Sequence, residues 1–588
     1  MMKLKSIKFS FFSLTIIFLL FYTFSFLFRS DYSFDQDLGR HIKLGEIILD
    51  KGVPKTNLFS YTFPDFNFIN HHYLFEIFVF EGQTLFGIQN LLILKLIIIL
   101  LAVFITFKIS SSNSILLLPI GFIFLHVLRD RVDLRPEIFS FLFTSLTYLI
   151  LDKFEKKYSK LIFILPVIQL FWTSTHIYFL LGIVLQFIFL IHFFFNKIGK
   201  QFKTLLIVFI SSLILSLLNP NGLNGFLYPL QVFGNYGYTI AENQNLFLLE
   251  SLNFNNPNYL FVKLSGLIII ISLIFAFLKH NLLWKNFLLS LLGLGLALFH
   301  IRSFPYLVFI SLPAVLGNFS IIKQSKITIG IFIIASILLL MESLFYLSGQ
   351  YYVQTNSGDK PGLFLGAHGE KALNFVIEND LPQPIFNNFD IGSYIIYRGF
   401  PKYKQSLRLN NLKVFVDGRP EAYPASFFQK VYIPMQENSE KFAQVDKEIN
   451  FKTIIFSHTD QTPWAKTFLS TITKNPDWQI IYLDDFMIIL IKKDANLNQD
   501  LKTIDLSLLT PNQYNYNDFL PYLRIGLFLL NNNQLNSAKL FTQKALEIAP
   551  ENPIANLIMA NLLYSEKNII FSPQIQKYLN KSQNKIWW

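Results

Sequence analysis

The sequence predicts an all-helical membrane domain followed by a small α/β domain and a helical tail. Hydrophobic residues make up 52% of the 588 residues and charged residues only 15%, which is typical of a chain largely dissolved in lipid. About eleven apolar stretches fill the first part, each near the roughly 20 residues that cross a hydrocarbon core of about 30 Å. The composition then becomes polar. We expect a membrane domain over 1–350, an α/β domain over 360–495 and a tail over 515–588.

The first apolar stretch is expected to be an uncleaved anchor. No small-residue cleavage site occurs before Arg29, so the stretch is expected to stay in the protein. Lys3, Lys5 and Lys8 at its start place the N-terminus in the cytoplasm. The expected spans are, in chain order, 7–28, 88–107, 114–128, 136–151, 160–174, 177–196, 203–218, 259–278, 285–300, 304–317 and 327–347.

Lysines and arginines occupy different loops of this topology. The loops assigned to the cytoplasm carry lysine, as the positive-inside rule requires, and an odd number of spans places the C-terminal domains outside the cytoplasm. The chain is therefore expected to be a multi-pass protein of the cell membrane. The cytoplasmic lysines are Lys108, Lys153, Lys156, Lys157, Lys160, Lys197, Lys200, Lys203, Lys279, Lys285, Lys323 and Lys326.

Four arginines lie in short loops assigned to the outer side, where membrane insertion disfavours positive charge. Arg129, Arg131 and Arg135 fall between the third and fourth spans, and Arg302 falls between the ninth and tenth. A guanidinium presents a rigid fork that matches phosphate or carboxylate oxygens. We expect a shared anion site at the outer surface. Alternatively, each arginine pairs with a neighbouring aspartate or extends to lipid headgroups.

The charge distribution and the lack of cysteine argue against a nucleic-acid-binding protein and against sites built on cysteine. The net charge of +12 is spread through the loops instead of forming the basic face of a nucleic-acid-binding protein, so no nucleic-acid partner is expected. Cysteine is absent, which excludes disulfides and thiolate metal sites.

The first outer loop, residues 29–87, is rich in polar side chains. Residues 37–50 are expected to form an amphipathic helix that ends at Gly52, and residues 71–86 a second helix at the membrane surface. His72 and Glu76 lie one helical turn apart, but one such pair is common by chance, and no metal site is expected.

Several motifs follow one another in this loop and beyond it. They are Asp35-Gln-Asp37, Gly39, His41, Gly52-Val-Pro54, Phe59-Ser-Tyr-Thr62, His71-His72, Leu134-Arg135-Pro136, Trp172 to His176 with Gly182, and Asn219-Pro-Asn-Gly222. In this order, over roughly residues 30–320, they resemble the GT-C superfamily of multi-span glycosyltransferases, which take sugars from polyprenyl-phosphate or polyprenyl-diphosphate carriers on the outer face. The sequence departs from the pattern in having Gly39-Arg40 where a tryptophan is usual, and Ser174-Thr175 where an asparagine commonly precedes the histidine.

The resemblance implies transfer of a sugar from a polyprenyl-phosphate donor to a lipid, glycan or protein acceptor on the extracytoplasmic face, without a cofactor. Such transfer needs a base for the acceptor and cations for the phosphate leaving group. The matching base is Asp37, with Asp35 as the second candidate. The residues expected to hold the phosphate are Arg129, Arg131, Arg135, Arg302 and Arg40, and those expected to orient the sugar or acceptor are His41, His72, His176 and Glu76.

Two of these residues have simpler interpretations. Asp37 is also placed to be the N-cap of the helix that follows it, and His176 to make a structural hydrogen bond at a helix break.

The polar C-terminal part shows short apolar runs beginning near Pro384, Lys413, Thr453, Gln479 and Met487, which predict strands of the α/β domain. A turn in it carries three charged residues that either contact the acceptor or form a structural ion-pair cluster. They are Asp417, Arg419 and Glu421.

The tail resembles a tetratricopeptide repeat in the spacing of Tyr522, Gly526, Ala538, Ala545 and Pro550. About one and a half repeats are visible, which is too few for an independent solenoid. We expect the tail to pack on the α/β domain or to bind a protein partner.

The alternative function is a non-catalytic transporter, or a scaffold for cell-surface polysaccharide assembly, whose outer arginines bind anionic membrane lipid. Transporters usually carry internal duplication and polar residues at mid-depth. The absence of a duplicated half and the clustering of polar residues at one surface favour chemistry.

Overall fold

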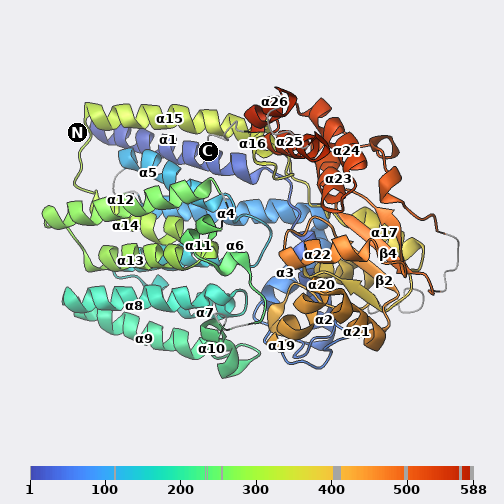
Figure 1. The fold of residues 1–588 in the computed structure, drawn as a ribbon. Coiled ribbons are helices and arrows are strands. Elements are labelled where there is room, and N and C mark those ends of the chain that lie inside the picture. Colours follow the sequence, from blue (N-terminus) through green and yellow to red (C-terminus); the bar gives the residue numbers. More distant parts are fainter. Residues whose placement is uncertain are drawn as a thin grey trace.

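The computed structural model describes residues 2–110, 114–231, 234, 236–252, 254, 256–400, 412–495, 501–567 and 573–582. For residues 2–10, 35, 114, 566 and 567 it describes the backbone alone. Long helices lie side by side in one half of the molecule, and the α/β part and the tail cover one end of this bundle (Figure 1).

All eleven ranges expected to span the membrane fall on helices. Several of these helices begin with a short 3₁₀ or π turn, and α5 continues as a 3₁₀ turn over His126–Leu128. The helices are α1 (Met2–Leu27), α4 (Leu91–Ile109), α5 (Ser114–Leu125), α6 (Glu137–Lys156), α7 (Leu165–Thr173), α8 (Leu180–Phe195), α9 (Gly199–Ser216), α12 (Asn258–Leu278), α13 (Trp284–Phe299), α14 (Leu312–Asn318) and α15 (Lys326–Leu347).

Five helical segments of the described chain are long and apolar enough to cross a membrane. They support the expectation of a membrane protein, whereas the count of about eleven spans stays a prediction. Other apolar helices, such as Phe11–Leu27 and Trp284–Phe299, are shorter. The five segments are Ile88–Ile109, Ile177–Phe195, Gly199–Ser216, Asn258–Leu278 and Lys326–Leu347.

The first outer loop folds into a π-helical turn, η1 (Phe34–Leu38), and the helices α2 (Gly39–Lys51) and α3 (Tyr73–Phe86). Helix α2 ends at Gly52, whose φ of +84° favours glycine. The two helices pack so closely at Gly45 that a Cβ at this position would clash with the carbonyl oxygen of Glu76.

The α/β part contains a four-stranded sheet in the order β1-β2-β4-β3. Strands β1 and β2 are parallel, with Phe386 opposite Ile454, and the other pairs are antiparallel, with Ile455 opposite Ile489. The strands are β1 (Ile385–Asn387), β2 (Thr453–Ser457), β3 (Trp478–Leu483) and β4 (Met487–Lys492), and the longer helices beside them are α17 (Glu370–Glu378), α18 (Gly392–Gly399), α21 (Ser439–Ile449) and α22 (Pro463–Ile472).

The strand expected over residues 413–417 does not join the sheet. Val414 instead forms an isolated parallel bridge with Ser60 of the first outer loop. The Val414 amide donates to the Phe59 carbonyl at 3.1 Å, and the Tyr61 amide donates to the Val414 carbonyl at 3.2 Å. The expectation was wrong because the backbone groups of this segment find their partners in the membrane-side loop.

Five shorter helices of the described chain lie in the segments between the longer elements. They are α10 (Gly222–Gln231), α11 (Leu246–Ser251), α16 (Gln350–Thr355), α19 (Ala425–Phe427) and α20 (Ile433–Glu437).

The tail consists of helical hairpins, in which α23 packs on α24 and α25 on α26. The tail also contacts the α/β part, because the Tyr514 hydroxyl donates to the Leu483 carbonyl at 3.2 Å and the Thr473 hydroxyl to Asn532 at 2.9 Å. Assignment of these hairpins to tetratricopeptide repeats stays a prediction. The helices are α23 (Phe519–Asn531), α24 (Leu535–Ile548), α25 (Pro553–Lys567) and α26 (Pro573–Ser582).

A buried ion pair joins three segments at the end of the bundle that faces the α/β part. Asp31, just after α1, accepts from Lys95 of α4 at 2.9 Å and from the Leu134 amide at 2.9 Å. The two charged side chains are 1% and 0% exposed. Removing one partner would leave an uncompensated buried charge, which is strongly destabilising.

We therefore expect Lys95→Met to lower the free energy of unfolding by about 3–5 kcal/mol, and thermal unfolding in detergent measures this loss. The matched control is Lys108→Met, which changes an exposed lysine of the same helix. Equal loss in both variants would contradict the prediction, and Asp31→Asn combined with Lys95→Met should recover part of the stability.

Candidate active site

Three of the predicted arginines surround one carboxylate, that of Glu242. Arg131 Nη1 lies 2.8 Å and Arg135 Nη1 3.2 Å from Oε1, and Arg302 Nη2 lies 2.8 Å from Oε2. Arg131 also makes a bidentate pair with Glu137, at 3.0 and 2.8 Å. The three guanidinium groups are thus held together by one carboxylate of the protein, and a shared site for an external anion stays a prediction.

Glu242 was not identified from the sequence. It lies in a 3₁₀ turn, Ala241–Asn243, which meets the turn that carries Arg302 through a 3.1 Å hydrogen bond from the Ile301 amide to the Gln244 carbonyl. The only sequence signal is that Glu242 and Glu250 are the acidic residues of a loop predicted outside.

Arg129 lies in a different environment. Its Nη1 donates to the Tyr346 hydroxyl at 2.7 Å and to Glu342 at 3.4 Å, and its guanidinium lies over the rings of Phe261 and Tyr351. The structure therefore separates Arg129 from the three arginines around Glu242.

The alternative interpretation of the arginines holds in a modified form. They do pair with acids, but not with the adjacent aspartates. Asp130 accepts from Asn256 at 2.7 Å, and Asp133 pairs with Arg29 at 2.9 Å.

Asp37 lies beside the arginine cluster. Its Oδ1 accepts from Arg40 Nη2 at 3.2 Å, and its Oδ2 lies 3.7 Å from Arg135 Nε. The side chain keeps 26% of its surface exposed. Asp37 is inside η1, and the N-cap of α2 is Leu38, so the interpretation of Asp37 as the N-cap is wrong. The side chain of Asp35 lies outside the described residues.

The backbone around Gly39 and Arg40 leaves no room for a large side chain at position 39. A Cβ on Gly39 would lie 2.9 Å from the Ser393 carbonyl oxygen, so no tryptophan fits beneath α18. The Arg40 amide donates to the Ser393 hydroxyl at 2.9 Å, and its buried Nε has no hydrogen-bond partner among the described residues.

The predicted histidines and Glu76 form one group. His41 Nδ1 lies 3.0 Å from Glu76 Oε1, and Asn70 donates to Glu76 Oε2 at 2.6 Å. The ring of His72 lies 5.6 Å from that of His41 and 5.5 Å from that of His176.

His176 has a structural hydrogen bond as well. Its Nδ1 lies 2.7 Å from the Ser140 hydroxyl, which also accepts from Trp172 Nε1 at 2.7 Å. Among the described residues, no group of three or more histidine, aspartate or glutamate side chains could hold a metal ion.

Burial controls the protonation of this group. It raises the pKa of the Glu76 carboxyl to about 7 and lowers the pKa of His41 well below its usual value, an effect that the Arg40 charge increases. His41 is therefore neutral at physiological pH.

The charged turn of the α/β part forms an ion-pair cluster. Arg419 Nε and Nη2 donate to the two Asp417 oxygens at 2.8 and 2.7 Å, and Nη2 also donates to Asn57 of the first outer loop at 2.6 Å. Burial raises the pKa of Glu421. The Asp417–Arg419 pair thus connects this turn to the membrane side.

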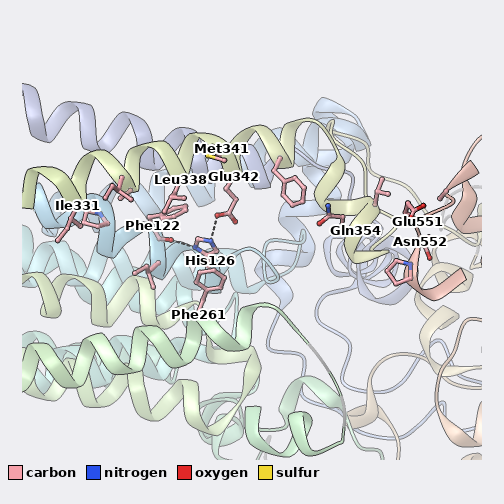
Figure 2. A pocket seen from close by; sticks show the side chains of 18 of the residues that line it. Phe122, His126, Phe261, Ile331, Leu338, Met341, Glu342, Gln354, Glu551 and Asn552 are labelled. Carbon is pink, nitrogen blue, oxygen red and sulfur yellow. Dashed lines mark hydrogen bonds and ion pairs between the residues drawn. The ribbon is translucent and has the colours of Figure 1, made fainter. Parts of the chain in front are cut away.

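An apolar cavity of about 1030 Å³ lies between α5, α12, α15 and residues 548–553. Figure 2 shows its length, from Ile331 at one end to Asn552 at the other, with His126 and Glu342 between them. His126 Nε2 lies 2.8 Å from Glu342 Oε2, and Glu342 is also the carboxylate that Arg129 contacts. Arg129 is therefore close to the polar part of this cavity.

No known family model and no curated protein match the chain. Solved structures of the archaeal oligosaccharyltransferase AglB from Archaeoglobus fulgidus are similar to it at 11% identity. The complex with an inhibitory peptide and a dolichol-phosphate has a TM-score of 0.49 over 96% of this chain and 87% of that chain. The apo form has a TM-score of 0.47 over 92% and 86%.

The raised pKa of Glu76 predicts a pH-dependent stability. Since the folded-state pKa of about 7 exceeds the unfolded value, the contribution of Glu76 to stability is fully present below about pH 4.5 and is lost as the pH rises through 7. The loss attributable to Glu76 is about 3 kcal/mol. Thermal unfolding from pH 5 to 8 should therefore show a steeper decline in the wild type than in Glu76→Gln.

The matched control is Glu81→Gln, on the same helix, which should keep the wild-type slope. A Glu76→Gln profile parallel to that of the wild type would contradict the prediction.

Proposed function

We propose that this protein is an integral membrane glycosyltransferase that moves a sugar from a polyprenyl-phosphate donor to a lipid, glycan or protein acceptor on the extracytoplasmic face. One observation carries the proposal: the Asp37 carboxylate lies beside Arg135, which shares Glu242 with Arg131 and Arg302. The motif resemblance to GT-C enzymes supports it.

The arrangement supplies the two elements that the chemistry needs. Asp37 would take the proton of the acceptor hydroxyl or amine as that atom attacks the anomeric carbon. The carbon–oxygen bond to the phosphate breaks, and its electron pair leaves with the phosphate. A single displacement of this kind inverts the anomeric configuration.

The arginines would stabilise the negative charge of the leaving phosphate. Glu242 neutralises only part of their charge. The buried Nε groups of Arg40, Arg135 and Arg302 have no hydrogen-bond partner among the described residues, and a phosphate oxygen would reach them only when these side chains reorient.

The neutral histidine group extends the site away from the arginines. His41, His72 and Glu76 would orient the sugar or acceptor, and His176 would support His72 through their ring contact.

The donor's isoprenoid chain would lie in the apolar cavity near Arg129. Phe122, Ile331 and Leu338 line this cavity. An isoprenoid chain would bury its apolar surface against these apolar side chains. Arg129 would then hold the lipid phosphate as it approaches Arg131.

The charged loops support an orientation with the N-terminus in the cytoplasm and the α/β part outside, since the lysine-rich loops and the arginine cluster are assigned to opposite sides.

The base assignment predicts that Asp37→Asn lowers sugar transfer at least about 100-fold, because the amide cannot accept the proton. The measurement uses the full-length protein in nanodiscs with radiolabelled polyprenyl-phosphate sugars. Asp65→Asn, an exposed change in the same loop, should keep wild-type activity.

Equal turnover by wild type and Asp37→Asn would remove Asp37 as the base. Failure of the wild type with every donor would favour the transporter or scaffold alternative.

The cavity assignment predicts a chain-length effect. Ala335→Trp would fill the cavity, so transfer from a long polyprenyl donor should fall at least about tenfold, while transfer from a short water-soluble isoprenoid analogue changes little. Ile333→Trp, on the exposed face of the same helix, is the matched control. A uniform loss with both donors would contradict the assignment.

A further inference from the structure

A polar pocket of about 360 Å³ lies between the outer end of the membrane bundle and the α/β part. Residues of the first outer loop and of the arginine loop form one wall, and residues from the ends of β1 and β2 form the other. The lining residues that matter here are Tyr32, Gln36, Arg135, His368, Asp390 and Asp460.

One end of the pocket is acidic and accepts hydrogen bonds. Asp390 is partly buried, and its carboxylate has no hydrogen bond or ion pair among the described residues. Asp460 accepts from Asn388 Nδ2 at 3.2 Å and from the Thr462 amide at 2.9 Å. Burial, together with the nearby carboxylates of Asp460 and Asp37, raises the pKa of Asp390 to about 7. A ligand that donates hydrogen bonds fits this end.

The other charges of the lining are already matched. Arg29 pairs with Asp133 at 2.9 Å and with Asp359 at 3.1 Å, and Arg524 pairs with Asp485 at 3.3 Å. Because the charges of Arg29 and Arg524 are paired with carboxylates of the protein, the pocket favours a neutral ligand over an anionic one.

A stacked aromatic pair lies in the same pocket. The rings of Tyr32 and His368 are stacked, with centroids 4.0 Å apart and planes at 12°, and the ring of Phe486 lies 4.9 Å from that of His368. Burial lowers the pKa of His368 to about 3, so this ring is neutral. Carboxylates that accept hydrogen bonds lie here beside an aromatic face. This combination matches a pyranose ring, whose edges carry hydroxyl groups and whose face carries apolar C–H groups.

The remaining end of the pocket reaches the candidate active site. Gln36 precedes Asp37 in the chain, and its side-chain oxygen accepts from Arg135 Nη2 at 2.7 Å. A group held in this pocket is therefore adjacent to the proposed base and to the proposed phosphate-binding arginines.

We propose that this pocket is the specificity site for the transferred glycan, a neutral polyhydroxylated sugar whose hydroxyls donate to Asp390 and Asp460 and whose ring packs on Tyr32 and His368. The proposal rests on the proposed function, because it places the sugar beside Asp37. It gives the α/β part a direct role in choosing the substrate.

The test measures sugar binding separately from transfer. Saturation-transfer NMR of the full-length protein in nanodiscs uses free glucose, galactose, mannose and N-acetylglucosamine as probes. At least one sugar should give a signal with the wild type, and Asp390→Asn should weaken its binding at least about fivefold, because the loss of charge weakens hydrogen bonds from sugar hydroxyls. Asp477→Asn, an exposed change in the same part, should leave binding unchanged.

Because Asp390 makes no contact that asparagine would remove, the fold should persist, and gel filtration checks it. Tyr32→Ala, which removes the aromatic face, provides a second variant with the same expected loss of binding. The proposal is overturned if no sugar gives a signal, if methylammonium alone does, or if Asp390→Asn and Tyr32→Ala both bind as the wild type does.

Free-sugar binding requires no base, so Asp37→Asn should keep the signal. Normal transfer by Asp37→Asn would remove the proposed base while leaving the pocket intact. Loss of the signal in Asp37→Asn alone would overturn the assignment of this pocket.

Discussion

The carboxylate of Glu242 is shared by three guanidinium groups, and the surface where the helical bundle meets the α/β part is organised around it. Like-charged side chains from one loop repel one another, and burying them costs desolvation free energy. Glu242 offsets both costs for Arg131, Arg135 and Arg302, because its two oxygens lie within 3.2 Å of all three. Arg135 then lies beside Asp37, so the position of the proposed base depends on this interaction.

Ion pairs, more than apolar packing, connect the segments at this end of the bundle. Apolar contacts between helices are weakly directional in a lipid environment, whereas a buried pair such as Asp31–Lys95 has one geometry. The Arg29 contacts to Asp133 and Asp359 similarly join the first loop, the arginine loop and the segment after α15. These pairs add specificity of arrangement more than stability.

The α/β part is not merely appended to the helical bundle. It forms the second wall of the polar pocket. Ser60 pairs with Val414, and the Arg40 amide bonds to Ser393, so the first outer loop is held between the bundle and the sheet. The pocket that contains Asp390 and Asp460 exists only because these two parts meet.

The sequence by itself determined the helices and most of the site's residue types. Apolar length predicts helices because the bilayer requires them, and the misplaced arginines indicated a charged outer surface. Three of the four arginines in the short loops, together with Arg40, Asp37 and the histidine group, do lie in neighbouring clusters. Which acid pairs with which arginine was decided by the tertiary structure, because the partners are far apart along the chain: Arg302 is 60 and Arg135 107 residues from Glu242, and Arg129 is 213 residues from Glu342. Contacts between distant segments, which no local pattern encodes, also decided three other features. These are the separate environment of Arg129, the bridge made by Val414 and the pocket beside Asp390.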